Sequence, residues 1–339
     1  MKKAYLILAV LLSSGMAFGQ DSKVEISGSA DVYYKYDFAK RENIQTSFGT
    51  DQNSLSIGML DVVAKKTTGK TSFVGELSFG PRGQFQSIPN GDGREGDEGN
   101  TFNVQNLYVS YNVNDDLKLT AGYMSTFEGY EMISPAANFH YSTSYLFTNG
   151  PFQNAGLKAN YAVSDKVDVM LGVFTDTWNT YKTDPNNGLS TIGGQVAFRP
   201  AENISTYFDF LTGDESGTLF DFTGNFQVTD AFKLAVNAAT FKHGDASTRD
   251  FSGVALYPSY AITDNFALGL RGEYFTYQDK GSESQEITAF TLSGNLKSGD
   301  LMFIPEIRLD SGKNEIFLDV DGAPTKSASQ VLMACVYTF

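Results

Sequence analysis

Apolar and polar residues alternate along most of the chain. In the stretch 166–175, apolar residues occupy positions 167, 169, 171 and 173, and Asp168 lies between them. The stretches 154–163, 220–228 and 301–310 repeat this pattern. Because side chains along a strand point to opposite faces in turn, each stretch predicts a strand with one apolar face.

About sixteen such runs of roughly ten residues occur, which is the length of strand that crosses a membrane at a tilt. The alternation is least regular in Ser54–Lys65 and Ile287–Lys297. The predicted number of strands therefore has a margin of one hairpin in either direction. The pattern predicts an all-β protein.

A short turn phrase recurs after these runs: an aliphatic residue, a small polar residue, Asp, a variable residue and an apolar residue. It starts at Val113, Val163, Val228 and Ile262. Asp, Asn, Ser and Thr bond to nearby backbone and favour turns. Three further tight turns bring the number to about seven. Longer polar connections alternate with them, which predicts an antiparallel up-and-down transmembrane β-barrel with short periplasmic turns and long external loops.

The last nine residues, Val331–Phe339, form another such strand. Every second residue back from Phe339 is apolar or aromatic. A strand that faces lipid gains from a terminal aromatic side chain at the membrane interface. We expect Phe339 to be the signal that barrel-assembly machinery reads. The alternative is an ordinary buried last strand.

The first residues have the pattern of an export signal. Lys2 and Lys3 precede a short apolar run, Ala4–Leu12, and Ala17-Phe-Gly19 supplies small residues for cleavage. The run is too short for a membrane helix. We therefore expect a signal peptide at residues 1–19 and one barrel at 20–339, located in the outer membrane of a Gram-negative bacterium.

The composition favours strands and tight turns over helices. Phe (27), Tyr (18) and Gly (33) are frequent, Pro occurs nine times, and the one cysteine cannot form an internal disulfide. The formal net charge is −14. Such acidity argues against nucleic acid and anionic lipid as partners.

Charged residues fall on the polar face of the predicted strands, which would be the inner face of the barrel. A barrel of sixteen strands is wide enough for a water-filled channel. Since acids outnumber bases, the sequence suggests a mild cation preference. Alternatively, the charges pair across strands and only stabilise the wall. The predicted pore-lining residues are Glu25, Asp31, Lys35, Glu76, Lys118, Lys158, Asp168, Arg199, Asp209, Asp221, Lys233, Arg271, Glu273, Glu306, Arg308 and Asp310.

The third long connection, Phe127–Phe152, is unusually rich in aromatic residues. An apolar loop of this length is expected to pack on something, and the inside of the barrel is available. We expect it to fold inward and narrow the pore. The alternatives are an aromatic plug or a patch at the rim. The predicted constriction residues are Glu131, Asn138, His140, Tyr141, Ser144 and Tyr145.

The same loop carries a resemblance to a known family. Gly129-Tyr-Glu131, Asn138, Tyr141-Ser-Thr-Ser144 and Gly150-Pro-Phe152 are similar to the corresponding phrase of the OmpL-like β-barrel porins. The resemblance implies an outer-membrane porin. It supplies no substrate and no catalytic residues.

Other chemistry has little support in the sequence. His140 and His243 lie in different predicted loops without a nearby cysteine, so neither a metal nor a cofactor is expected. The tract 90–99 has carboxylates but not the regular spacing of a calcium loop. His140 with Ser142 or Ser144 is the one candidate for a hydrolase at the rim, and we expect no enzyme.

The sequence therefore predicts a porin for passive diffusion of small hydrophilic solutes or ions. Its expected surroundings are outer-membrane lipid, and a homotrimer is expected by analogy. The alternative function is a non-conducting barrel that acts as an adhesin or structural protein through its external loops.

Overall fold

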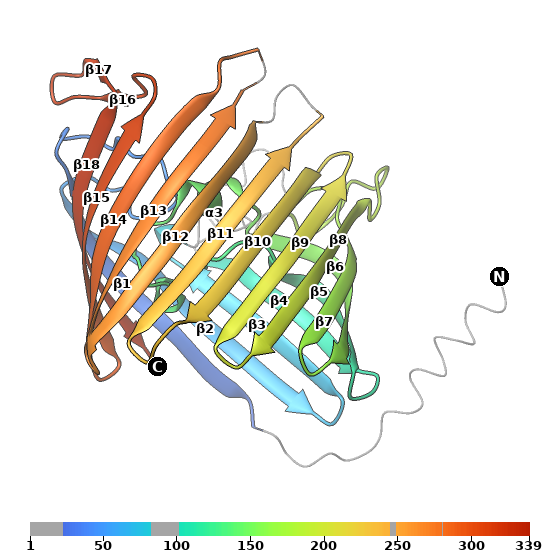
Figure 1. The fold of residues 1–339 in the computed structure, drawn as a ribbon. Helices are drawn as coiled ribbons and strands as arrows, with labels where there is room; N and C mark the ends of the chain where they lie inside the picture. Colours follow the sequence, from blue (N-terminus) through green and yellow to red (C-terminus); the bar gives the residue numbers. More distant parts are fainter. Residues whose placement is uncertain (1–22, 83–101, 245–248, 280) are drawn as a thin grey trace.

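The chain forms one closed antiparallel barrel of sixteen strands, β1 to β15 and β18 (Figure 1). This computed structural model describes residues 23–82, 102–244, 249–279 and 281–339. The sequence prediction of fold and strand number is confirmed. The barrel strands are β1 Glu25–Asp37, β2 Ser54–Thr68, β3 Thr71–Phe79, β4 Phe102–Asn112, β5 Leu117–Ser125, β6 Gln153–Ser164, β7 Val167–Phe174, β8 Thr191–Ala201, β9 Ile204–Gly213, β10 Gly217–Gln227, β11 Phe232–Lys242, β12 Asp250–Thr263, β13 Phe266–Gln278, β14 Gln285–Ser298, β15 Leu301–Gly312 and β18 Ser327–Thr338.

The last strand closes the barrel. β18 lies between β15 and β1, and the backbones of Gly28 and Phe339 exchange two hydrogen bonds of 3.0 Å. Closure satisfies the edge groups that an open sheet would expose to lipid. The two least regular stretches of the sequence are also strands, β2 and β14.

Short turns and long loops lie at opposite ends of the barrel (Figure 1). In the turn after β4, the Asn114 side chain accepts bonds from the backbone of Asp116 and Leu117 at 3.0 and 2.7 Å, as the turn phrase predicts. The loop after β15 carries a separate small hairpin of β16, Phe317–Leu318, and β17, Pro324–Thr325. The expected signal peptide and the acidic tract 90–99 lie outside the described residues.

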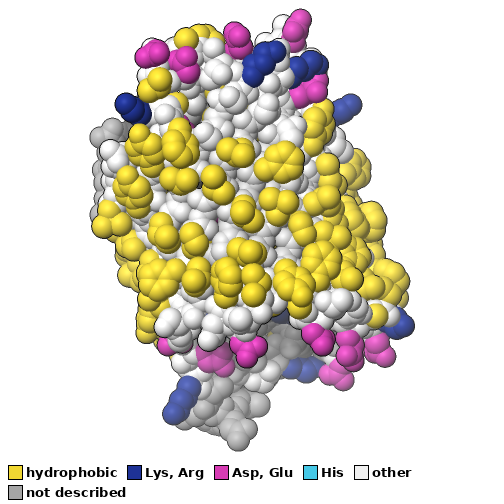
Figure 2. Space-filling view, turned by 60° about the vertical axis from the view of Figure 1, so that its left-hand side comes forward, with side chains coloured by type: hydrophobic (Ala, Val, Ile, Leu, Met, Phe, Trp, Pro, Cys, Tyr) yellow, Lys and Arg dark blue, Asp and Glu magenta, His cyan; other side chains and the backbone are white. Residues whose placement is uncertain are grey.

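The outer face of the barrel is apolar. Figure 2 shows hydrophobic side chains spread over the middle of one side, with charged side chains at the two ends. Next to the short turns, a belt of aromatic residues is exposed: Tyr111, Tyr161, Phe198, Tyr260 and Tyr337. Such a belt suits the interface between lipid and water. No helix in the described ranges is long and apolar enough to cross a membrane.

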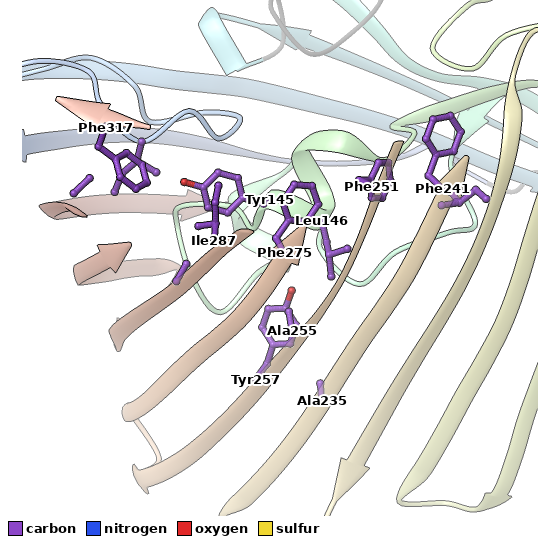
Figure 3. Packing of buried hydrophobic residues seen from close by; sticks show 14 of the residues in the cluster. Tyr145, Leu146, Ala235, Phe241, Phe251, Ala255, Tyr257, Phe275, Ile287 and Phe317 are labelled. Atoms are coloured by element: carbon purple, nitrogen blue, oxygen red, sulfur yellow. The ribbon is translucent and has the colours of Figure 1, made fainter. Parts of the chain in front are cut away.

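The inner face is less polar than the sequence suggested. Near the end with the long loops, inward positions of β9 to β14 carry a buried apolar cluster (Figure 3) that includes Leu211, Leu219, Phe241, Phe251 and Phe275. Leu219 and Phe275 lie beside the exposed apolar residues Phe220 and Tyr274 on the same strands, so the polar–apolar period of two is lost at these positions. The residues of the cluster bury apolar surface against the loop between β5 and β6, described next.

Candidate functional site

The connection between β5 and β6, residues 126–152, is called loop 126–152 here. It contains a short 3₁₀ turn, Pro135–Ala137, and a single helical turn, α3, Tyr145–Asn149. Local sequence explains α3: the Ser144 side chain accepts a bond of 3.0 Å from the backbone of Phe147, and Gly150 ends the helix. The loop contacts the inner sides of several strands through charged residues.

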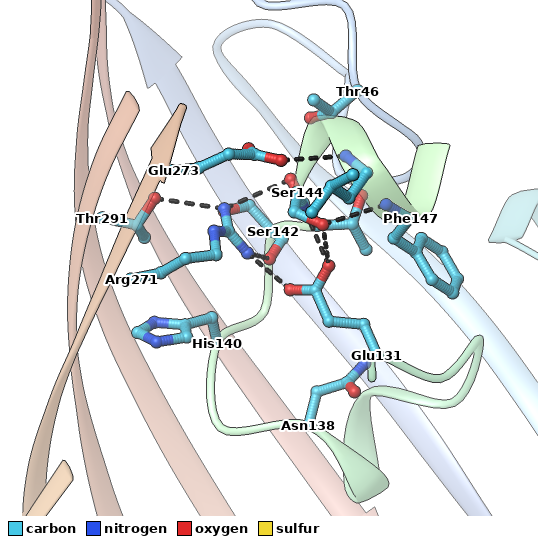
Figure 4. Close-up of polar contacts among 12 residues, drawn as sticks. Thr46, Glu131, Asn138, His140, Ser142, Ser144, Phe147, Arg271, Glu273 and Thr291 are labelled. Atoms are coloured by element: carbon cyan, nitrogen blue, oxygen red, sulfur yellow. Dashed lines mark hydrogen bonds and ion pairs between the residues drawn. The ribbon is translucent and has the colours of Figure 1, made fainter. Parts of the chain in front are cut away.

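A buried ion pair joins the loop to β13. Arg271 Nη1 lies 2.7 Å from Glu131 Oε1, and the two side chains are 0% and 4% exposed. The other carboxylate oxygen of Glu131 accepts a bond of 2.8 Å from the backbone of Ser144 (Figure 4). Arg271 also donates to the carbonyl oxygens of Ser142 and Thr143. A buried ion pair is favourable only when hydrogen bonds satisfy its remaining donors and acceptors. In this cluster both carboxylate oxygens of Glu131 and both Nη atoms of Arg271 are bonded, whereas Arg271 Nε has no partner in the described part of the chain.

Glu273, two residues further along β13, binds the start of α3. Its two carboxylate oxygens accept bonds of 2.9 and 2.8 Å from the backbone of Tyr145 and Leu146. The first N–H groups of a helix have no partner within the helix, so an acceptor at this position satisfies them. The side chain of Leu146 then packs in the apolar cluster of Figure 3.

A second group of contacts lies on β15. Arg308 Nε is 2.8 Å from Asp310 Oδ1, and both side chains are fully buried. Tyr145 donates its hydroxyl to Asp310 at 2.7 Å, and Arg308 donates to the Thr143 carbonyl at 2.8 Å. Both residues of the pair therefore also bond the loop.

Tyr141 connects the loop to β1. Its hydroxyl donates to Asp31, and its backbone N–H donates to Glu306 of β15 at 3.1 Å. Arg82 lies over the Tyr141 ring, 4.5 Å from its centroid, and donates to the Tyr141 carbonyl at 2.9 Å. Burial raises the pKa of the Tyr141 hydroxyl well above its ordinary value, so the residue stays a donor.

The start of the loop lies against acids of β9 and β10. Gly129 donates its N–H to Asp221 at 3.1 Å, and Asp209 faces Asp221 across the two strands. Burial, and next the charge of Asp209, raise the pKa of Glu128 well above its ordinary value. Both Glu128 and Asp209 are buried.

A cavity lies on the other side of the loop, away from the strands that the loop bonds. Its volume is about 610 Å³, and it lies between loop 126–152 and inward residues of β2 to β6. We call it the β2–β6 cavity. Lys65, Glu76, Lys118 and Lys158 line it from the strands, and Ser134 and Phe147 from the loop.

The sixteen residues expected to line a pore lie in different settings. Glu76, Lys118 and Lys158 line the β2–β6 cavity, and Lys233 lines a second cavity of about 400 Å³ beneath the loop. Glu25 is exposed, and Arg199 is paired with Asp168. The nine others are buried: Asp31, Lys35, Asp209, Asp221, Arg271, Glu273, Glu306, Arg308 and Asp310.

Five of the six loop residues singled out in the sequence contact the wall or the residues that hold the loop, namely Glu131, His140, Tyr141, Ser144 and Tyr145. Asn138 differs, because its side chain closes a local turn with the backbone of Met132.

His140 Nδ1 lies 2.8 Å from Ser293 Oγ, whereas Ser142 bonds Arg271 and Ser144 bonds Glu131. Burial, and next the charge of Arg271, lower the pKa of His140 well below its ordinary value. No group of three His, Cys, Asp or Glu in the described part of the chain is arranged to hold a metal ion.

Sequence reasoning missed two contributors. Arg82 follows β3 and lies 4.3 Å from the centroid of Phe48 as well as against Tyr141. The loop between β1 and β2 covers α3: Ser47 donates to Thr148 at 2.8 Å and accepts from Thr143 at 2.6 Å. Apolar Ile44 and Phe48 in the middle of a mostly polar loop were the available signal.

Comparisons with known proteins agree with this geometry. The family model described as "Putative beta-barrel porin-2, OmpL-like" matches residues 23–339. No curated protein matched the sequence.

Three solved structures illustrate the likeness of fold. The outer membrane channel DcaP of Acinetobacter baumannii is 14% identical, with 95% of this chain and 99% of that chain covered and a TM-score of 0.62. An anion-selective porin from Comamonas acidovorans is 14% identical, with 94% and 100% covered and a TM-score of 0.62. A trimer form of OmpT from Vibrio cholerae is 12% identical, with 94% and 100% covered and a TM-score of 0.56.

Proposed function

We propose that this chain, which belongs to the putative beta-barrel porin-2, OmpL-like family, is an outer-membrane porin through which small hydrophilic solutes diffuse passively. The observation that carries the proposal is the β2–β6 cavity, about 610 Å³ of space within a closed sixteen-stranded wall. Barrels of this strand number are wide enough to enclose water.

In this proposal loop 126–152 narrows the pore. Its bonds to Asp31, Arg271 and Asp310 support a fixed position against one side of the wall. Because buried side chains fill that side, solutes pass through the β2–β6 cavity. Glu76, Lys118 and Lys158 then line the path, while the buried acids and bases hold the loop.

The proposal includes no catalytic step. His140 is bonded to Ser293, and the serines beside it in sequence bond other residues. A cleavable signal peptide at residues 1–19 and recognition of Phe339 by the assembly machinery complete the expected route to the outer membrane. The trimer form of the OmpT structure supports a homotrimer as the working assembly.

Planar bilayers provide the test. The purified barrel should give stepwise conductance, and deletion of residues 138–147 should raise the current of each step. Deletion of residues 180–187, in the loop between β7 and β8, is the control for shortening a loop elsewhere. A folded barrel, verified by circular dichroism, that gives no current would instead favour an adhesin or structural role. An unchanged current after the 138–147 deletion would rule out the constriction.

A further inference from the structure

Three lysines surround the β2–β6 cavity. Lys65 comes from β2, Lys118 from β5 and Lys158 from β6, and all three line the cavity wall. Within the described ranges, none of them forms an ion pair, whereas Arg199, Arg249, Arg271, Arg308 and Lys313 do. The positive charge of these lysines is therefore available to a solute.

Lys118 and Lys158 are close neighbours on the inner face. In the β5–β6 ladder, Lys118 is opposite Asn160 and Lys158 is opposite Thr120. This makes the two lysines diagonal neighbours, and such pairs lie roughly 7–8 Å apart. Like charges at this separation repel each other, and an anion between them relieves the repulsion.

The acids around the cavity do not cancel this charge. Glu131 is already paired with Arg271, and Glu76 is the remaining carboxylate of the lining. Asp61 on β2 is buried and is not part of the lining. The unpaired charges that face the cavity are thus three cations and one anion.

The sequence suggested a cation preference instead, because acids outnumber bases over the whole predicted inner face. Several of those acids, including Asp31, Glu273 and Asp310, are bonded to loop 126–152 and are buried away from the cavity. Exposed acids of the external loops act weakly at the cavity, because charges in water are screened beyond about 8–10 Å at physiological ionic strength.

We infer that the β2–β6 cavity is a passage for small anions that carry carboxylate or phosphate groups, with Lys118 and Lys158 as the groups that attract them. This rests on the proposed porin function. The cavity volume of about 610 Å³ is in the range of small-molecule sites. Conduction requires that a solute be bound weakly enough to leave. Lysine meets this requirement, because its strongly hydrated ammonium cannot form the bidentate hydrogen bonds by which arginine binds carboxylate and phosphate.

The test is the reversal potential of the single channel under a gradient of potassium chloride. We expect the sign that indicates preference for chloride. The variant with Lys118→Gln and Lys158→Gln should lose this preference. Each substitution should lower the ratio of chloride to potassium permeability by roughly twofold. Lys66→Gln is the matched control, because Lys66 pairs with the outward-facing Phe73 and should leave the ratio unchanged.

Competition then separates the two kinds of anion. Succinate or inorganic phosphate, added at constant ionic strength, should reduce the chloride current of the wild type and not that of the double variant. The anion with the stronger effect identifies the class. Preference for potassium in a conducting barrel, or a current that neither anion reduces, would overturn the inference while leaving the porin function intact. A barrel without current would refute the porin function itself.

Discussion

The guanidinium of Arg271 on β13 lies 2.7 Å from the carboxylate of Glu131 in loop 126–152, 140 residues earlier in the chain. Both side chains are almost completely enclosed. The same arginine bonds the carbonyls of Ser142 and Thr143, so one side chain fixes two parts of the loop. The position of the loop therefore depends on a few buried charges.

Replacement of Arg271 by Met should release the loop. Removal of one partner leaves Glu131 buried without a cation, which costs about 3–5 kcal/mol. Chymotrypsin is the measurement, since the loop is rich in aromatic residues. When opening and closing are fast, the rate of cleavage is proportional to the fraction of molecules with a released loop. Cleavage within the loop should therefore accelerate by about 100-fold or more. Arg249→Met is the control, because Arg249 and Asp279 form an exposed pair worth at most about 1 kcal/mol. Equal cleavage rates in Arg271→Met and Arg249→Met would show that Arg271 does not hold the loop.

Gly58→Ala should displace Tyr141. A Cβ at Gly58 would lie 1.8 Å from Asp31 Oδ2 and 2.7 Å from the Tyr141 hydroxyl oxygen. Overpacking of this kind costs about 1–3 kcal/mol. Hydrogen–deuterium exchange of the loop amides should increase. At Gly75 the nearest atom would be 3.7 Å away, so Gly75→Ala serves as the control. Protection that stays the same in Gly58→Ala would show that the Asp31–Tyr141 contact does not hold the loop.

Loop attachment should weaken as pH rises above about 4.5, the ordinary pKa of a glutamate. Burial and the neighbouring Asp209 raise the pKa of Glu128, so the attached loop keeps a proton that the released loop loses. Between the two pKa values, each increase in pH therefore favours release. Channel current recorded from pH 4 to pH 8 should rise, and less so in Glu128→Gln. An identical pH profile in both proteins would exclude Glu128 as the group responsible.

Phe339→Ala should reduce the amount of folded barrel in the outer membrane and leave the conductance of the assembled channel unchanged. Phe339 closes the barrel through backbone bonds to Gly28, which the substitution retains. Its exposed ring is therefore free for recognition during assembly. Phe303→Ala, at another exposed aromatic residue of the outer face, is the control. Comparable yields of the two variants would refute a special role for the terminal residue.

Some features of the site could be anticipated and others could not. Tyr141 was identified because aromatic residues are unexpected in an external loop, but its partner Asp31 is 110 positions away and carries no sign of that contact. Arg82 was overlooked because nothing in its surroundings distinguishes it from a solvated loop arginine. The apolar cluster on the inner face was missed since Phe251 and Phe275 interrupt the period of two on which strand faces were assigned.

The sequence by itself determined the barrel. Alternation with a period of two assigns each strand its outward face, and turn residues separate short connections from long ones, because both are local properties of the backbone. Only the tertiary structure decided which inward charges are paired within the protein and which face a cavity. Arg271 and Lys158 are both bases on an inner face, yet one is buried against Glu131 and the other faces a cavity. That difference arises from where loop 126–152 packs, and packing brings together residues that the order of the chain keeps apart.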